Sequence, residues 1–182
     1  MNLLFRRINN EDLRMILEWR TNPDVTKFMY TDLEFDIDNQ KIWYERIQKD
    51  LSRKDWIINA DEEDVGLVSI VNIDKVNKRC EWAYYLGSPS VRGKGVGKSV
   101  ELNILNYVFE VLKLQKLCCE VFTSNEMVIK LHEKFGSVVE GTRRRHIFKN
   151  GKYHDITEMG ALKEDWLENV KGKIKYANAI FE

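Results

Sequence analysis

The sequence lacks the features of a membrane-spanning, secreted or disulfide-bonded protein. No apolar run in its 182 residues approaches the roughly 20 that cross a bilayer, and the N-terminus has no signal-peptide pattern. There are only three cysteines, and the adjacent pair Cys118 and Cys119 would point to opposite faces of a strand, which disfavours a bridge. We therefore expect a cytoplasmic protein that has no membrane partner and whose thiols serve core packing.

The sequence also lacks an excess of charge of either sign, and it lacks the residue spacings that are typical of metal sites. Lys plus Arg and Asp plus Glu both number 29, so the formal net charge is zero. A nucleic acid is therefore not expected as a reactant, despite the local run Arg143–Arg145. The Cys and His spacings match no zinc site, so no metal is expected. There is neither low complexity nor an internal repeat, and the length suits one domain, residues 1–182.

The patterns that are present predict an α/β (α+β) protein. We expect Asn9 or Asn10, Asp36 and Ser124 to cap helices, and Gly136 to end one in a left-handed conformation. Asn150-Gly151 predicts a hairpin turn. The expected strands cover residues 3–8, 55–60, 65–74, 81–86, 116–122, 137–148 and 152–162. The expected helices cover residues 11–20, 25–30, 36–51, 98–112, 125–135 and a tail from 163, with the last ten residues unassigned.

The segment Arg92-Gly93-Lys94-Gly95-Val96-Gly97 lies between a predicted strand and a predicted helix. Three glycines in five residues let the backbone enter conformations that are closed to other residues. The helix start adds unpaired N–H donors and the positive end of the helix dipole. With Arg92, Lys94 and Lys98 nearby, the segment predicts an anion site, whereas a single glycine would indicate only a tight turn.

The spacing distinguishes between kinds of phosphate loop. A nucleotide-triphosphate loop needs a glycine where Arg92 stands, and a dinucleotide fingerprint would place its third glycine on Lys98 or Val100. The order Arg92, Gly95, Gly97 instead resembles the pyrophosphate-binding loop of the GCN5-related N-acetyltransferases (GNAT), which hold acetyl-coenzyme A (acetyl-CoA).

A second stretch, Asn125–Gly136, resembles the other signature of the same superfamily, an Asn followed by an apolar helix and an aromatic-Gly end. Across nearly the whole chain the sequence is similar to the UDP-4-amino-4,6-dideoxy-N-acetyl-beta-L-altrosamine N-acetyltransferases of pseudaminic acid biosynthesis. The matching stretches are Glu18–Pro23, Lys116–Val121, Lys130–Gly136 and Lys149–Asp155.

The resemblance implies a GNAT fold, with a mixed, mostly antiparallel sheet of about seven strands that is flanked by helices and splayed at the cofactor site. It implies acetyl-CoA as cosubstrate and direct transfer in a ternary complex, without an acyl-enzyme. The residues expected at the cofactor are Tyr85, Leu86, Arg92, Gly93, Lys94, Gly95, Val96, Gly97, Lys98, Ser99 and Asn125.

Transfer to an amine needs a base, because a protonated amine has no lone pair, and a leaving thiolate benefits from an acid. His132 occupies the position that in many of these enzymes carries a tyrosine acting as general acid. It also shares a helical stripe with Val128 and Phe135, so a packed core histidine is the alternative. Glu81, on the strand before the loop, is the candidate base, and the alternative is a surface cross-strand charge.

The resemblance further implies a small-molecule acceptor, a UDP-linked 4-amino-4,6-dideoxy sugar that is acetylated on its 4-amino group. Two other functions stay open: acetylation of a protein N-terminus or another small amine, and a non-catalytic acyl-CoA-binding module. The oligomeric state also stays open, a homodimer included. Residues 14–53 and the final hairpin are expected to decide the acceptor. The expected acceptor-binding residues are Trp19, Arg20, Met29, Tyr30, His154 and Asp155.

Overall fold

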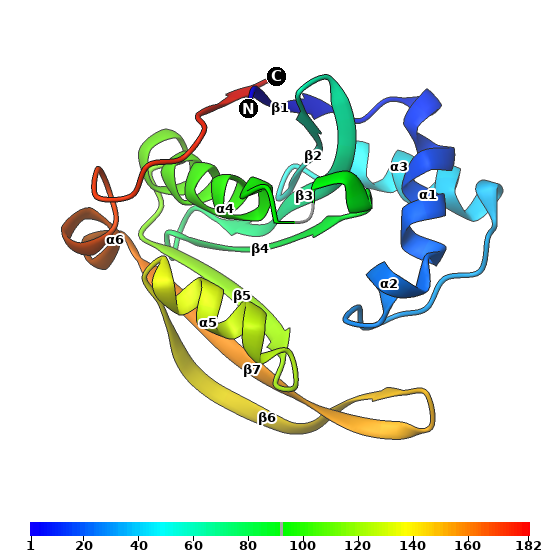
Figure 1. The fold of residues 1–182 in the computed structure, drawn as a ribbon. Coiled ribbons are helices and arrows are strands. Elements are labelled where there is room, and N and C mark those ends of the chain that lie inside the picture. Colours follow the sequence, from blue (N-terminus) through cyan, green and yellow to red (C-terminus); the bar gives the residue numbers. More distant parts are fainter. Residues whose placement is uncertain (92) are drawn as a thin grey trace.

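One eight-stranded sheet runs through the chain (Figure 1). The computed structural model describes residues 1–91 and 93–182, so Arg92 lies outside the described residues. The strand order is β6-β7-β5-β4-β3-β2-β1-β8. Strands β4 and β5 pair in parallel, as do β1 and β8, and the other neighbours are antiparallel. The predicted mixed, mostly antiparallel sheet is therefore confirmed.

The elements follow the predicted order. The strands are β1 (Leu3–Arg7), β2 (Lys54–Ala60), β3 (Glu63–Asp74), β4 (Arg79–Leu86), β5 (Lys116–Phe122), β6 (Ser137–Lys149), β7 (Lys152–Leu162) and β8 (Ala179–Phe181). The helices are α1 (Leu13–Thr21), α2 (Pro23–Thr26), α3 (Ile37–Lys49), α4 (Val96–Asn106), α5 (Glu126–Lys134) and α6 (Lys163–Asn169). Short turns of helix are η1 (Asn10–Asp12), η2 (Pro89–Val91) and η3 (Tyr107–Val111). In the described part of the chain, no helix is long and apolar enough to cross a bilayer.

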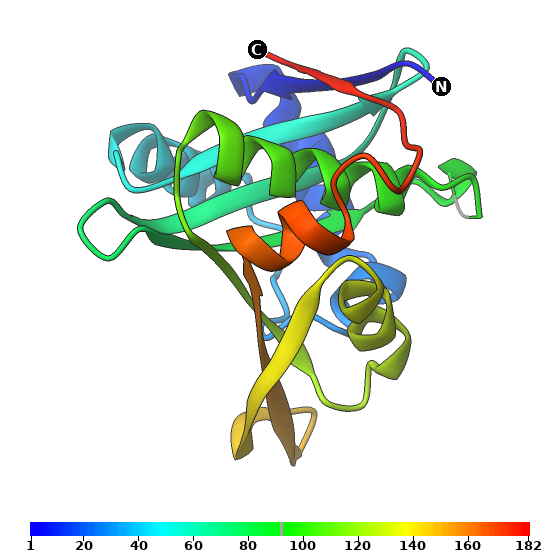
Figure 2. The same ribbon diagram turned by 90° about the vertical axis from the view of Figure 1, so that its left-hand side faces the viewer.

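Helices cover both faces of the sheet, and each face has its own hydrophobic core (Figures 1 and 2). Strand side chains alternate between faces, so consecutive apolar residues serve different cores. Ile57 and Leu67 pack with α1 and α3, whereas their neighbours Ile58 and Val68 belong to the larger core with α4. Strands β2 and β3 are therefore buried on both sides, which explains their continuous apolar runs.

The sheet opens between β4 and β5. Their pairing runs only from Arg79 opposite Lys116 to Glu81 opposite Cys118. Beyond that point β4 stays paired with β3 up to Leu86, and β5 stays paired with β7 up to Phe122. The two parts of the sheet spread apart from there, as Figure 1 shows. The splay that was expected at the cofactor site is therefore present.

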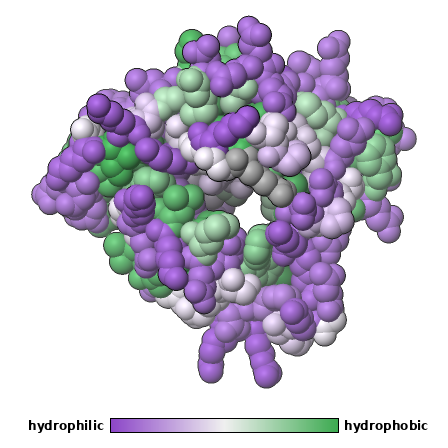
Figure 3. All heavy atoms as spheres, viewed as in Figure 1, coloured by the Kyte–Doolittle hydropathy of each residue, from purple (hydrophilic) through white to green (hydrophobic). Residues whose placement is uncertain are grey.

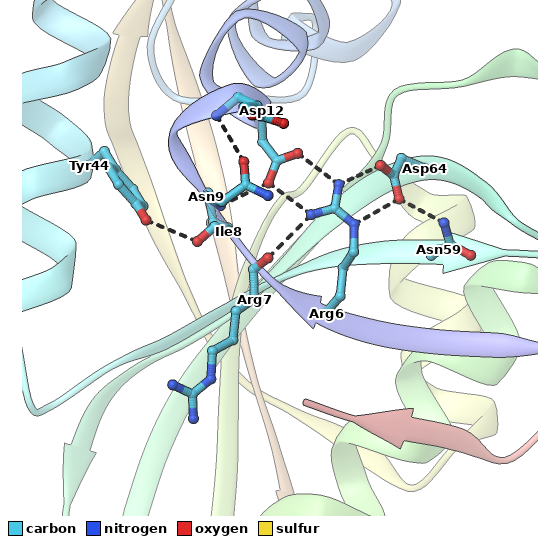
Figure 4. Close-up of polar contacts among 9 residues, drawn as sticks. Arg6, Arg7, Ile8, Asn9, Asp12, Tyr44, Asn59 and Asp64 are labelled. Carbon is cyan, nitrogen blue, oxygen red and sulfur yellow. Dashed lines mark hydrogen bonds and ion pairs between the residues drawn. The ribbon is translucent and has the colours of Figure 1, made fainter.

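An arginine-centred network fixes α1 and α3 to the first strand (Figure 4). Arg6 donates hydrogen bonds of 2.7 and 2.8 Å to the Asp12 carboxylate at the start of α1, and it also bonds Asp64 of β3. These carboxylates, Asp12 first, raise the pKa of the Arg6 guanidinium. Tyr44 of α3 donates to the carbonyl of Ile8 over 3.0 Å. Both helices are thereby held at a fixed distance from the sheet.

Most local predictions hold, with corrections at α2 and α5. The short helix predicted over residues 25–30 instead covers Pro23–Thr26, because Asn22 caps it by accepting a hydrogen bond from Asp24 N and Pro23 suits the first helical turn. Asn9 and Asp36 accept hydrogen bonds from the first turns that follow them, and Gly136 has a φ of +92°. The N-cap of α5 is Asn125 and not Ser124, and its side chain makes no capping hydrogen bond. The helix start is one residue later than the Ser124 prediction because Asn125 N already bonds Phe122 O in the preceding turn.

The C-terminal segment forms a strand that was not predicted. β8 pairs in parallel with β1, with Ala179 opposite Leu3. Phe181 packs edge-on against Phe5, with ring centroids 4.8 Å apart, and Trp56 donates to the carbonyl of Glu182. Only three residues pair, and their partner strand lies at the other end of the sequence, so no local pattern could indicate them.

Candidate active site

The glycine-rich loop leads from β4 into α4, as predicted. Gly93 and Gly95 have φ values of +76° and +78°, which side chains other than hydrogen adopt only at a cost. Gly95 is the N-cap of α4, and the first bond of the helix runs from Ser99 N to Gly95 O over 3.1 Å. The earlier N–H groups, those of Val96 to Lys98, point out of the helix start, where an anion is stabilised.

Gly97 and Ser99 have separate roles in this loop. A Cβ at Gly97 would lie 3.0 Å from Tyr84 Oη, so the absence of a side chain lets the helix rest on β4. Ser99 is buried, and its hydroxyl accepts a hydrogen bond from Ala177 N over 3.3 Å. That contact connects α4 to the C-terminal segment. The hydroxyl of Ser99, which was predicted to bind the cofactor, therefore already has a partner within the protein.

A cavity of about 580 Å³, here called the donor cavity, occupies the splay between β4 and β5. One edge of β4 is paired with β3, so the main-chain groups of its other edge face this space. An extended chain with amide groups, such as the pantetheine arm of acetyl-CoA, fits such an edge. Figure 3 shows an opening in the middle of this face of the molecule. The lining comprises residues 81–86 of β4, residues 119–122 of β5, Val71 of β3, Arg20 of α1, residues Asn125, Val128 and His132 at α5, and residues near α2.

A second cavity of about 750 Å³, here called the acceptor cavity, lies against α1, α3 and the segment that joins α2 to α3. It shares wall residues with the donor cavity, so a molecule in one lies next to a molecule in the other. The shared residues are Arg20, Met29, Thr31, Ala83, Tyr84 and Tyr85. Its further polar and aromatic lining includes Asp32, Glu34, Asp36, Trp43, Arg46 and Arg53.

Many of the residues predicted for the site reach these cavities. Arg20, Met29 and Tyr85 line both, and Tyr30, Glu81, Leu86, Asn125 and His132 line the donor cavity. The other acceptor candidates lie apart from both cavities: Trp19 packs edge-on to Tyr85, His154 packs against Phe122, and Asp155 accepts a hydrogen bond from Arg145 N. Roles for all of these residues stay predictions.

His132 is both packed and next to the donor cavity. It is only 4% exposed, and its ring lies edge-on to Trp82 with centroids 5.5 Å apart. Its Nδ1 lies 2.7 Å from Oε1 of Glu101, which is 1% exposed on α4. Glu101 was not predicted, because a glutamate on a mostly apolar helix is ordinarily read as part of the solvated face.

Glu81 lies on the other face of the sheet from His132. The alternation along β4 places Trp82 in the core with α4 and Glu81 toward the side of α1 and α3. The neighbouring carboxylate of Glu120 is engaged, since it accepts from Tyr30 Oη over 2.9 Å and pairs with Arg143 at 2.9 Å. Among the described residues no side chain pairs with Glu81, so it is the carboxylate available to take a proton.

Lys149, at the end of β6, was also missed. Its side chain is 5% exposed, and Nζ donates to the carbonyl of Thr26 over 2.6 Å and pairs with Asp32 at 2.8 Å. A lysine before an Asn-Gly turn is expected in solvent, so its burial has no local signal. Lys149 instead joins the final hairpin to the segment that lines the acceptor cavity.

A splayed mixed sheet with an anion-binding glycine loop at the start of a helix defines an acyl-CoA-dependent transferase. Residues 2–138 match the acetyltransferase (GNAT) domain family, and the chain belongs to this family. It is 32% identical to the acetyltransferase PseH of Campylobacter jejuni (strain 81-176) over 130 residues, which are 71% of this chain and 79% of that protein. The recognition made from the sequence is thus confirmed.

Polyamine acetyltransferases are similar as well. The chain is 29% identical to spermidine N(1)-acetyltransferase of Escherichia coli K12 over 166 residues, 91% of this chain and 89% of that protein. The crystal structure of spermidine N-acetyltransferase from Vibrio cholerae with CoA and spermine superposes with a TM-score of 0.85 and 25% identity, covering 91% of this chain and 98% of that one. The protein is therefore an N-acetyltransferase that uses acetyl-CoA. No group of three His, Cys, Asp or Glu in the described residues is placed to hold a metal ion.

Proposed function

We propose that the chain transfers the acetyl group of acetyl-CoA to the 4-amino group of a UDP-linked 4-amino-4,6-dideoxy sugar, by direct attack in a ternary complex. The identity to PseH and the stretches of similarity named above support a nucleotide-sugar acceptor. The observation that carries the proposal is the balance of unpaired charges in the acceptor cavity.

Three arginines line the acceptor cavity, and two of them are available. Arg53 is bound by Asp55 through hydrogen bonds of 2.6 and 2.7 Å. Arg20 donates to the Thr31 hydroxyl over 3.3 Å and lies over the Tyr85 ring, 6.0 Å from its centroid. No carboxylate among the described residues pairs with Arg20 or Arg46. A guanidinium presents a planar fork of donors that matches phosphate oxygens. These two side chains suit the pyrophosphate of a nucleotide sugar.

The carboxylates of the same cavity are mostly engaged. Asp32 pairs with Lys149, and Asp36 accepts hydrogen bonds from Asp38 N and Asn39 N as the cap of α3. Only Glu34 is left without such a contact among the described lining residues. Two available cations against one available anion favour an anionic acceptor over a polycationic one.

The reaction is assigned to the glycine loop and to two residues of the donor-cavity lining, Glu81 and His132. The loop from Gly93 to Lys98 holds the pyrophosphate of acetyl-CoA, and the free edge of β4 holds its arm. Glu81, in the lining of the donor cavity, removes the proton of the acceptor amine, directly or through water. His132 supplies a proton to the sulfur from the opposite face of the sheet, so base and acid do not compete for one position.

A polyamine is the second candidate acceptor. The spermidine acetyltransferases named above support it, and so do the carboxylates Asp32, Glu34 and Asp36 in the cavity lining. A polyamine that used all three carboxylates would have to compete with the present partners of Asp32 and Asp36. An acceptor with phosphates does not compete with these partners.

Thermal shift with UDP and with spermidine tests the proposal. A ligand that binds only the folded state stabilises it by RT ln(1 + [L]/Kd), so UDP should raise the Tm and Arg46→Ala should remove most of that rise. Arg14→Ala is the matched control, because Arg14 is an exposed arginine on α1 that pairs with Glu18 and lines neither cavity. A Tm rise with spermidine and none with UDP would contradict the proposal.

A further inference from the structure

Glu101 and His132 form a buried pair beneath the donor cavity. Glu101 comes from α4, the helix that starts at the glycine loop, and His132 comes from α5. Their contact at 2.7 Å joins Oε1 to Nδ1, and both side chains are at most 5% exposed. His132 lines the donor cavity, and since Nδ1 is turned to Glu101, the ring nitrogen that remains for the cavity is Nε2.

The carboxylate of Glu101 is poorly explained by stability alone. Its second oxygen, Oε2, is buried and has no hydrogen-bond partner among the described residues. A buried polar atom without a partner costs free energy, and an apolar side chain of similar size would usually be at least as stable. A carboxylate kept at such a cost points to a task other than packing.

Among the described residues, Tyr84 of β4 and Cys119 of β5 are the other titratable groups whose pKa is affected by the charge of Glu101. Burial raises the pKa of Tyr84, and it raises the pKa of Cys119 to about 12. Both groups therefore stay neutral near pH 7. Of the described groups, Glu101 is the one in direct contact that can balance a proton on His132.

We propose that Glu101 is a positioning residue that keeps Nδ1 of His132 protonated, so that Nε2 is the atom that exchanges a proton with the donor cavity. The inference rests on the proposed acetyl transfer, whatever amine is the acceptor. The amine nitrogen forms a bond to the acetyl carbon, the bond from that carbon to sulfur breaks, and the amine proton leaves to Glu81 or water. His132 gives its Nε2 proton to the departing thiolate, keeps the Nδ1 proton in its bond to Glu101, and is reprotonated from solvent.

The first test is spectroscopic and needs no acceptor. The chain has three histidines, so His146→Gln and His154→Gln assign the 15N ring signals of His132 by elimination. We expect a proton on Nδ1 in the parent protein and its loss from Nδ1 in Glu101→Leu, where the ring should take the Nε2–H form. An unprotonated Nδ1 in the parent, or an unchanged pattern in Glu101→Leu, would overturn the inference.

The second test separates positioning from folding. Glu101→Gln keeps the shape and a hydrogen bond to Nδ1 but not the charge, so kcat should fall roughly 10- to 100-fold, and by more in Glu101→Leu, with the KM for acetyl-CoA within about 2-fold. Asn103→Leu is the control, because Asn103 is buried on the same helix but bonds Ala177 O and Ala179 N. It should lower the Tm without changing the ring signals.

The acceptor is whichever of a UDP-amino sugar and spermidine the parent protein acetylates. If kcat in Glu101→Gln equals that of the parent, the positioning role is wrong while the proposed function stands. If the parent acetylates only spermidine, the proposed acceptor is wrong, and both tests of Glu101 still decide the inference.

Discussion

Lys149 Nζ donates a hydrogen bond to the main-chain carbonyl of Met29 over 2.7 Å. Met29 lines both cavities and belongs to the segment that joins α2 to α3. Lys149 stands at the turn of the last hairpin, so the hairpin is attached to this segment. The contact joins residues that are 120 positions apart in the sequence. It also gives the hairpin a role that does not require His154 or Asp155 to touch the substrate.

Lys149→Met should weaken the binding of the acceptor and leave the binding of acetyl-CoA unchanged. Met keeps an unbranched side chain, one atom shorter than that of Lys, but the carbonyls of Thr26 and Met29 lose their donor and Asp32 loses its partner. We expect the KM for the acceptor to rise about 10-fold and the KM for acetyl-CoA to change less than about 2-fold. Lys152→Met, an exposed lysine across the same turn, should change neither. Equal increases in both KM values would show that Lys149 acts on the whole fold.

Gly95→Val should act mainly on the cofactor. A valine with φ near +78° is strained, and it would stand at the helix start where the pyrophosphate approaches. The KM for acetyl-CoA should rise about 10-fold or more, against less than about 2-fold for the acceptor. Gly172→Val carries a similar strain, at +74°, but away from the loop, so it should lower the Tm and spare both KM values. Similar changes in both KM values for Gly95→Val would indicate a folding defect.

His132→Phe tests the acid directly, and the structure changes how its Tm must be interpreted. Phe removes the ring nitrogens and leaves the buried Glu101 carboxylate without its partner, so the Tm should fall whether or not His132 is catalytic. The decisive quantity is kcat of the folded variant, which should drop roughly 100-fold while acetyl-CoA still binds. His132→Tyr should recover part of the loss. A folded His132→Phe enzyme with full turnover would end the catalytic assignment.

The three cysteines should react with a thiol reagent in a defined order. Burial raises the pKa of all three thiols, to about 12 for Cys80 and Cys119, and Cys118 is the one that is partly exposed. At pH 8 a thiol reagent should therefore react with Cys118 first and with all three only after unfolding. Because folding keeps these thiols neutral, their contribution to stability is complete below the unfolded pKa, near 9, and is lost as pH rises toward 12. Rapid reaction of all three thiols in the folded protein would contradict this burial.

The sequence predicts most of the fold because its signals are local. Asn9, Asp36, Gly136 and the Asn150-Gly151 turn each act within a few residues, and the glycine loop combines a turn with a helix start. β8 could not be predicted in the same way, since three residues gain their strand conformation only from β1.

Local spacing predicted the loop, and the family resemblance predicted separate residues such as Arg20 and His132 that line the cavities. The contacts between distant segments were not predicted. The loop residues are neighbours in sequence, so their spacing predicts an anion site, and the family resemblance assigns that site to acetyl-CoA. The pairs Glu101 with His132 and Lys149 with Met29 join elements that meet only in the folded chain. Each of these charged side chains looks solvent-exposed in its own segment, because burial depends on a partner that local patterns do not contain.

The most direct test of the account is the ratio of kcat/KM for two acceptors with acetyl-CoA, measured from the CoA released. The available guanidinium groups of Arg20 and Arg46 predict that a UDP-linked 4-amino-4,6-dideoxy sugar is preferred over spermidine by about 100-fold or more, a difference that two phosphate contacts can supply. Arg46→Ala should reduce this ratio by lowering kcat/KM for the nucleotide sugar alone. An equal or higher kcat/KM for spermidine would contradict the nucleotide-sugar assignment.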